Sequence, residues 1–314
     1  MQRILDPARI EAFAERSIPR VRLPDSQSVF SRRAARLRKL AEQHSLGDYL
    51  RLMAVVADGQ QRLLNELVAS LGGEGFVEHI GRQIEVAHEH RMPVLQAAGW
   101  PRQQRWQTIL ERLCASVWEL PGFPDGVRAV CDRIRAADPA AIEEQADLLI
   151  SARNEGVDAQ AAPFVMAALQ VFWTAMAASL RLSDVVQIDV PGVCPVCGTL
   201  PVASVVRSDK SSNGFRYLHC PLCATEWHMV RITCSQCLAN EGIAYHTLAN
   251  ASDAIRAESC GQCHTYRKIL YQEKDPDVEP VADDLSSLAL DLLMSGEGFH
   301  RGSGNPLLWQ NPDG

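Results

Sequence analysis

The sequence predicts a multidomain α+β protein: an all-helical first part, two tandem small β metal modules, and a short C-terminal helix with a tail. Up to about residue 185, apolar residues recur at helical spacing and strand-like alternation is scarce. Beyond that point, short β-rich runs separate four Cys-x-x-Cys pairs, which use eight of the ten cysteines. Such pairs are typical of metal sites with four sulfur ligands.

The composition of the chain restricts the function classes it can serve. The chain has 314 residues, enough for two or three domains, and its hydrophobic share of 46% is ordinary for a soluble globular protein. Its net charge of −7 argues against nucleic-acid binding, because proteins that neutralise phosphates are normally basic. Residues 1–17 lack the apolar stretch of a secretory signal, so we expect a cytoplasmic protein whose cysteines stay reduced.

Changes in pattern divide the chain into four expected segments. A β-like run, Val185–Val190, precedes the first cysteine pair and indicates the end of the helical part. The expected segments are a helical domain at 1–187, a first metal module at 188–230, a second metal module at 231–272, and an acidic connector, amphipathic helix and extended tail at 273–314.

Helical patterns fill the first segment. They begin at Ser31 and Asp48 and continue over 75–90, 101–119, 125–136, 139–153 and 161–181. The uncharged stretch 159–180 is long enough to span a bilayer. Its many alanines and interspersed polar residues favour a helix buried in the centre of a bundle, so we do not expect a membrane-embedded protein. The two remaining cysteines, Cys114 and Cys131, fall in helical patterns and are expected to be buried core thiols.

The helix that begins at Ser31 carries a basic face. Its cationic residues are Arg32, Arg33, Arg36 and Lys39. Such a face is typical of a solvated helix surface, and the alternative is a site for an acidic partner.

Near the other end of the chain, an amphipathic helix follows the acidic connector, and we expect its apolar stripe to pack back on the protein. The stripe consists of Val281, Leu285, Leu288, Leu292 and Leu293.

The four Cys-x-x-Cys pairs repeat with an offset of 40 residues, and each half reads C-x2-C-x22-C-x2-C. Each pair with the turn that joins its two cysteines forms a knuckle, and the four knuckles are numbered in chain order. Two knuckles can deliver four sulfurs to one tetrahedral ion, so we predict two metal ions per chain. The ligands can pair in tandem, one ion per half, or interleave, and four sulfurs suit zinc and iron equally. The candidate ligands are Cys194, Cys197, Cys220, Cys223, Cys234, Cys237, Cys260 and Cys263.

The position after each knuckle favours a small residue, which eases the turn. Gly198 occupies this position after the first pair, and Ala224, Leu238 and His264 occupy it after the other three. The second half of the repeat is therefore the less regular one.

The sequence contains no evident catalytic constellation, and the predicted metal sites leave no open position, so we do not expect an enzyme. A cluster of Glu226, Trp227 and His228, with Arg231 close by, lies between cysteine pairs. Aromatic and arginine side chains commonly anchor contacts between proteins. The cluster is therefore a candidate partner-binding patch, and the alternative is support of the metal site or of the core.

Four sequence segments, taken together, resemble one protein family. They are CPVCG at 194–198, RYLHCPLCATEWHMVRITCSQC at 216–237, ESCGQCHTYRKILYQEKDP at 258–276 and VADDLSSL at 281–288. With them the chain resembles the formate dehydrogenase accessory proteins, the FdhE family, over about 194–308. The combined HCxxCxxEWHxxRxxCxxC run is far more specific than a Cys-x-x-Cys pair alone.

The resemblance implies a cytoplasmic maturation factor with two rubredoxin-like, zinc-ribbon-like modules behind a helical domain. It implies that the eight paired cysteines are ligands, that iron is favoured over zinc, and that the partner is the catalytic subunit of respiratory formate dehydrogenase, bound before export. His264 departs from the small residue expected at its position. Two other functions stay open, a rubredoxin-like electron carrier and a zinc-ribbon nucleic-acid module, as does a homodimer.

Overall fold

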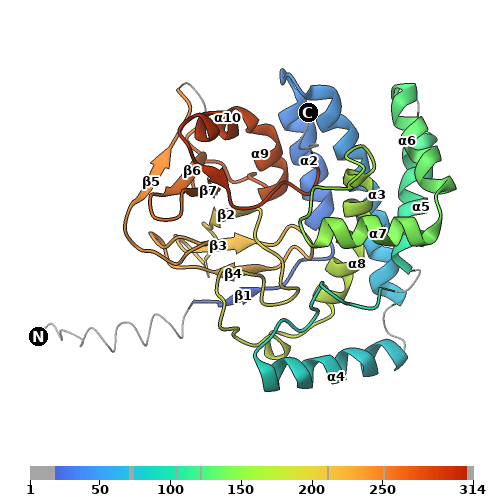
Figure 1. Ribbon diagram of the computed structural model, residues 1–314, viewed down its shortest axis with the longest axis horizontal. Coiled ribbons are helices and arrows are strands. Elements are labelled where there is room, and N and C mark those ends of the chain that lie inside the picture. The colour runs from blue at the N-terminus through green and yellow to red at the C-terminus, as the bar shows by residue number, and fades with distance from the viewer. Residues whose placement is uncertain are drawn as a thin grey trace, which may run out of the picture.

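The computed structural model describes residues 18–70, 74–102, 105–120, 122–210, 212–249 and 252–309. Figure 1 shows a helical region beside a twisted sheet, with two short C-terminal helices over the sheet. The helices of the helical region are α2 (Val29–Ala41), α3 (Gly47–Ser70), α4 (Glu74–His90), α5 (Arg105–Trp118), α6 (Asp125–Ala136), α7 (Pro139–Ile150) and α8 (Ala162–Ala178). The helical first part and the β-containing second part agree with the fold class predicted from the sequence.

Helix α8 forms the centre of the helical region. Every residue from Ala162 to Ala177 is buried, and α3, α5 and α7 all pack against this helix. An uncharged sequence without a polar face suits this position, because a helix that is apolar all round must be buried. The expected bundle-centre helix is thus confirmed. Across the described ranges, no helix combines the length and the apolar character that crossing a bilayer requires.

The two metal modules share one sheet. Its strands are β1 (Val21–Arg22), β2 (Ala203–Val206), β3 (Arg216–His219), β4 (Glu226–His228), β5 (Ile243–His246), β6 (Ile255–Cys260), β7 (Thr265–Tyr271) and β8 (His300–Arg301). Their order is β1-β4-β3-β2-β7-β6-β5, and β8 pairs with β7. The modules meet through a parallel pairing of β2 with β7, in which Ser204 lies opposite Ile269.

Two local predictions were wrong. Val185–Val190 forms no strand; a short 3₁₀ helix (Leu182–Asp184) leads into irregular chain there. The position in the sheet beside β4 is taken by β1, which comes from the N-terminal part of the chain. The C-terminal amphipathic segment forms two helices rather than one, α9 (Pro280–Ser286) and α10 (Leu288–Gly296).

The break between these two helices changes which apolar side chains are buried. Val281 and Leu285 pack in the core as expected, whereas Leu292 is exposed. On α10, the buried residues are instead Leu290 and Met294. The predicted stripe requires one continuous helix. Because the chain begins a new helix at Leu288, the residues of α10 face other directions than they would in a continuation of α9.

The basic face of α2 binds the acidic connector of the same chain. Arg33 lies 3.0 Å from Glu279, and Arg36 makes a two-pronged contact with Asp283. Both arginines are buried, so this part of the face is not a solvated surface. The acidic partner that the sequence left open is thus present within the chain.

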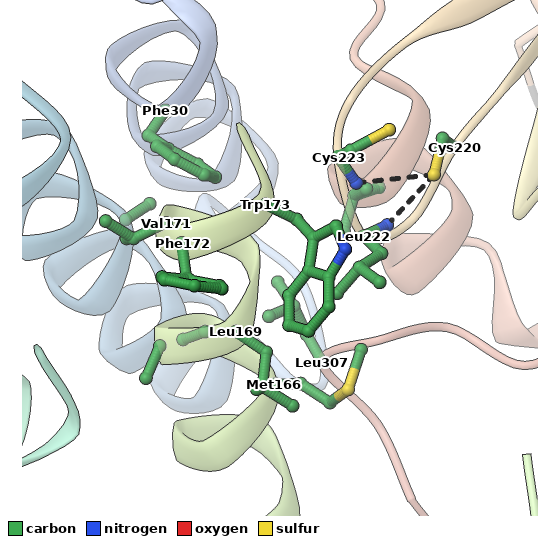
Figure 2. Close-up of a cluster of buried hydrophobic side chains, with 14 of the residues drawn as sticks. Phe30, Met166, Leu169, Val171, Phe172, Trp173, Cys220, Leu222, Cys223 and Leu307 are labelled. Atoms are coloured by element: carbon green, nitrogen blue, oxygen red, sulfur yellow. Dashed lines mark hydrogen bonds between the residues drawn. The ribbon is translucent and has the colours of Figure 1, made fainter. Parts of the chain in front are cut away.

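The helical region and the first metal module share one hydrophobic core. Figure 2 shows Trp173 of α8 beside Leu222 and Cys223 of the second knuckle. The Trp173 indole donates a hydrogen bond to the Leu95 carbonyl, and the Gln170 amide donates to the Pro221 carbonyl. Helix α8 therefore positions this knuckle directly.

Candidate metal centres

The first candidate centre consists of Cys194, Cys197, Cys220 and Cys223. Their sulfur atoms all lie within 4.8 Å of one another, and all four residues are buried. The closest pairs join the two knuckles: Cys194 and Cys223 are 3.6 Å apart, and Cys197 and Cys220 are 3.3 Å apart. The donor set is that of a tetrahedral site for a soft or borderline ion.

The second candidate centre consists of Cys234, Cys237, Cys260 and Cys263. Its sulfur atoms also lie within 4.8 Å of one another. The distances between its knuckles are 3.7 Å for Cys234 to Cys263 and 3.6 Å for Cys237 to Cys260. The four sulfurs of each half gather together, so the structure has the tandem arrangement and not the interleaved one. Two four-cysteine clusters are thus present that could hold two metal ions.

Backbone N–H groups point at the sulfur atoms of the knuckles. The N–H groups of Leu222 and Cys223 lie 3.4 and 3.3 Å from the Cys220 sulfur (Figure 2). In the third knuckle, the Gln236 and Cys237 N–H groups approach Cys234 in the same way. Such donors stabilise the thiolate form that a metal ion requires.

The residue after each knuckle has a left-handed backbone. The φ angles are +81° at Gly198, +56° at Ala224, +65° at Leu238 and +54° at His264. This conformation lets the turn close; for example, the Gly198 N–H donates to the Cys194 carbonyl at 2.8 Å. The sequence identified these four positions, and three of them adopt this geometry without the glycine that would do so at least cost.

Threonine hydroxyls lie near the sulfurs, and they were not predicted from the sequence. Thr199 lies 3.0 Å from the Cys220 sulfur, Thr225 lies 3.2 Å from the Cys223 sulfur, and Thr265 lies 3.0 Å from the Cys263 sulfur. A hydroxyl can donate to a thiolate, which strengthens the anionic form. The signal was available, since three of the four knuckles read C-x2-C-x-T. The third knuckle has Ala239 instead.

The environment of the clusters shifts the pKa values of their thiols. Burial raises the pKa of Cys194, and it also raises the pKa of Cys223. For Cys220, burial is outweighed by hydrogen bonds from the other three thiols and from the Cys223 N–H, and the pKa falls. Four buried thiolates repel one another, so the fully ionised first cluster requires a cation among its sulfurs.

The two clusters differ in their exposure to solvent. All ligands of the first cluster are buried, whereas Cys237 of the second cluster is exposed and Cys263 is half-buried. Hydrogen bonds from the Thr265 hydroxyl and backbone N–H outweigh burial at Cys263 and lower its pKa to about 7. The second cluster is therefore the one that solvent, chelators and oxidants reach first.

The candidate partner-binding patch is mostly internal. Glu226 is buried and ion-paired with Arg207, and the buried Trp227 donates a hydrogen bond to the Pro191 carbonyl. His228 is half-buried, and burial lowers its pKa. Arg231 alone of the four is exposed. Glu226 and Trp227 therefore support the first module, and the four residues do not form one accessible surface.

Known proteins of one family resemble this chain along nearly its whole length. Models of the FdhE family match three consecutive regions: the N-terminal region at 18–189, the central domain at 193–231 and the C-terminal domain at 232–308. An FdhE homologue of Cronobacter sakazakii is 41% identical over 311 residues, which cover 98% of this chain and 97% of the relative. FdhE of Salmonella paratyphi A is 41% identical over 93% of this chain and 92% of its own length.

A solved structure shows the same architecture. The crystal structure of the FdhE protein from Pseudomonas aeruginosa superposes with a TM-score of 0.80 at 35% sequence identity, covering 92% of this chain and 99% of that one. The agreement therefore extends over most of both chains. Sequence and structure agree over nearly the whole length, and this chain belongs to the FdhE family.

Proposed function

We propose that this protein is a non-enzymatic assembly factor for respiratory formate dehydrogenase, and that it binds the catalytic subunit of that enzyme in the cytoplasm before export. Family membership over nearly the whole chain is the observation that carries this proposal. The closed four-sulfur clusters also support it, because they leave no ligand position for a substrate.

We further propose that each four-cysteine cluster holds one ion and that iron is the physiological metal. Both clusters offer soft sulfur ligands, N–H donors to those sulfurs, and short distances between knuckles. A bound ion would cross-link the two knuckles of its module, and iron would add the ability to change charge by one electron. The cysteines hold the ion, while the threonine hydroxyls and the knuckle N–H groups stabilise their thiolate form.

The client would bind the loop that leads into the third knuckle. Arg231 is exposed there, and its neighbours Val230 and Ile232 are 62% and 59% exposed. Leu238, which directly follows the same knuckle, is 47% exposed. Ile232 has a φ of +63°, which is unusual for a β-branched residue and frequent at functional segments. Apolar side chains around an arginine can anchor a protein partner.

A second function, electron transfer, is favoured by one observation, the exposure of Cys237 at the second cluster. Electron exchange requires a metal site close to the surface. An electron carrier with iron in this cluster would bleach reversibly on one-electron reduction. A cluster that holds zinc, or that bleaches only with loss of metal, would contradict this second function.

The test of the assembly function combines binding with activity. In a deletion strain, formate oxidation should be lost while the transcript of the catalytic subunit persists. Co-purification of the catalytic subunit should fall with Arg231→Ala and persist with Arg153→Ala, which changes another exposed arginine in the helical region. Normal formate oxidation in the deletion strain would overturn the function. Equal co-purification by both variants would exclude only the proposed surface.

A further inference from the structure

We propose that a cavity beside the first metal centre is a binding site for a small oxyanion of the phosphate class. The cavity has a volume of about 120 Å³ and lies where β1, α2, α9 and the first module meet. One water molecule needs at least about 10–15 Å³ of such space. The cavity therefore has room for an anion of several heavy atoms.

Three arginines of different chain segments line this cavity: Arg22, Arg32 and Arg207. Arg207 uses its Nε and Nη2 atoms to bind Glu226. Arg22 uses its Nη1 atom to pair with Asp209 at 3.0 Å and to donate to the Ser212 hydroxyl, and its Nε lies 3.4 Å from Glu226. Arg32 is exposed, and its guanidinium group makes no hydrogen bond or ion pair within the described part of the chain. Guanidinium groups carry five donors in a fixed fork, which matches the oxygens of a phosphate.

The carboxylates that line the cavity are already bound within the protein. Glu226 accepts hydrogen bonds from Arg207, and Glu279 accepts from Arg33 and from two N–H groups at the start of α9. Asp25 accepts from a backbone N–H and a hydroxyl of its own turn. The charges around the cavity thus largely cancel, but the guanidinium N–H groups that remain unused are donors. A ligand with several acceptor oxygens complements them.

His219 provides a second, independent observation. It lines the same cavity and is only 5% exposed. Its Nδ1 lies 3.2 Å from Glu226, while its buried Nε2 has no partner within the described residues. A buried polar atom without a partner destabilises the folded protein, because it has lost its hydrogen bonds to water. Hydrogen phosphate carries both acceptor oxygens and an O–H group, so it can serve guanidinium groups and a ring nitrogen together, which a carboxylate cannot.

The location of the cavity would couple anion binding to the first metal centre. His219 immediately precedes the ligand Cys220, and Ala224, which also lines the cavity, immediately follows the ligand Cys223. An anion held here would therefore restrain the second knuckle on both sides. Because a ligand that binds only the native arrangement stabilises it, phosphate should slow metal release from the first cluster.

The test uses the full-length, metal-loaded protein and inorganic phosphate at constant ionic strength. Calorimetric titration should show one saturable site per chain. Arg32→Gln and Arg22→Gln should each weaken binding by about tenfold or more, since a hydrogen bond to a charged group contributes roughly 1.5–3 kcal/mol. Arg38→Gln is the matched control, because Arg38 is exposed on the same helix and binds Asp58 outside the cavity. It should bind phosphate like the wild type.

Two further measurements test the fold of the variants and the effect of phosphate on the first metal centre. Circular dichroism and metal content verify that each variant is folded. In the wild type, the rate of metal release from the first cluster should fall as the phosphate concentration rises. No saturable binding up to about 10 mM phosphate, which corresponds to an affinity too weak for a specific site, would overturn the proposal. So would equal binding by wild type and both cavity variants, or saturable binding of acetate in place of phosphate.

Discussion

The left-handed residue after each knuckle shows how a single position can carry strain for a metal site. Three of the four positions hold a residue with a Cβ atom, and an L-residue in this conformation costs roughly 1–2 kcal/mol. The chain tolerates this cost because the turn fixes the direction of both cysteines. That a small residue suits this position could be predicted from the sequence, since Gly198 stands at the first of the four. The left-handed conformation of Leu238 and His264 could not be predicted, because neither residue favours it.

Leu238→Gly should stabilise the second module by about 1 kcal/mol, because glycine adopts a φ of +65° without steric cost and the lost side chain is exposed. The measurement is the melting temperature of the metal-loaded protein. Leu238→Ala is the control: it removes the same side chain but keeps the Cβ atom, so it should give no gain. A gain with alanine equal to that with glycine would show that strain is not the cause.

Glu226 should be essential for stability rather than for recognition. Burial alone would raise its pKa, but the charge of Arg207 and the hydrogen bonds with His219 and Arg207 lower it below the usual 4.5. The folded protein therefore favours the ionised form, and this contribution to the free energy of unfolding is present above about pH 4.5 and is lost as the pH falls below it. Glu226→Gln should lower that free energy by about 3–5 kcal/mol at neutral pH, because it leaves Arg207 buried without its charge partner.

Chemical unfolding as a function of pH measures this effect. The difference between the wild type and Glu226→Gln should be constant at neutral pH and should shrink under acid conditions. Glu66→Gln is the control, since Glu66 pairs with Arg112 at an exposed position and such pairs contribute little to stability. A loss in Glu226→Gln no larger than in the control would contradict the structural role.

At the scale of elements, the two halves of the cysteine repeat share their ligand spacing but differ in their surroundings. The first cluster is covered by α8, while Cys237 of the second cluster faces solvent. A repeat in the sequence reveals the shared ligands and spacing. It does not reveal which copy is covered, because the covering helix lies outside the repeat.

Metal release should therefore occur in two phases, with the second cluster losing its ion first. A chelator in excess, monitored by absorption of the released metal complex, should resolve a fast and a slow phase of equal amplitude. Cys237→Ser should remove the fast phase and Cys194→Ser the slow one. A single phase in the wild type, or the reverse assignment in the variants, would contradict the difference in exposure.

At the scale of the whole molecule, the helical region and the first metal module share one hydrophobic core. The helices could be predicted because their periodicity is local. The contact between Trp173 and the second knuckle, and the binding of Glu279 and Asp283 to α2, are long-range. The sequence showed the basic and acidic segments separately, but not that they bind each other.

Residues 1–187 expressed alone should therefore form helices without a cooperative melting transition, because the apolar face of α8 loses its cover and the ion pairs of Arg33 and Arg36 lose their partners. Near-ultraviolet circular dichroism during heating, with the full-length chain as the reference, measures this. A sharp transition in the fragment, as sharp as that of the full chain, would establish a separable domain instead.

The most direct test of the central claim is the metal-to-protein ratio of chain purified without oxygen, measured together with its count of reactive thiols. Two four-cysteine clusters predict two ions per chain, with Cys114 and Cys131 the only cysteines that are not ligands. Cys194→Ser should lose the ion of the first cluster, and structural four-sulfur sites contribute on the order of 10 kcal/mol of apparent folding free energy. One ion per chain in the wild type, or four unligated thiols among the eight paired cysteines, would contradict the account.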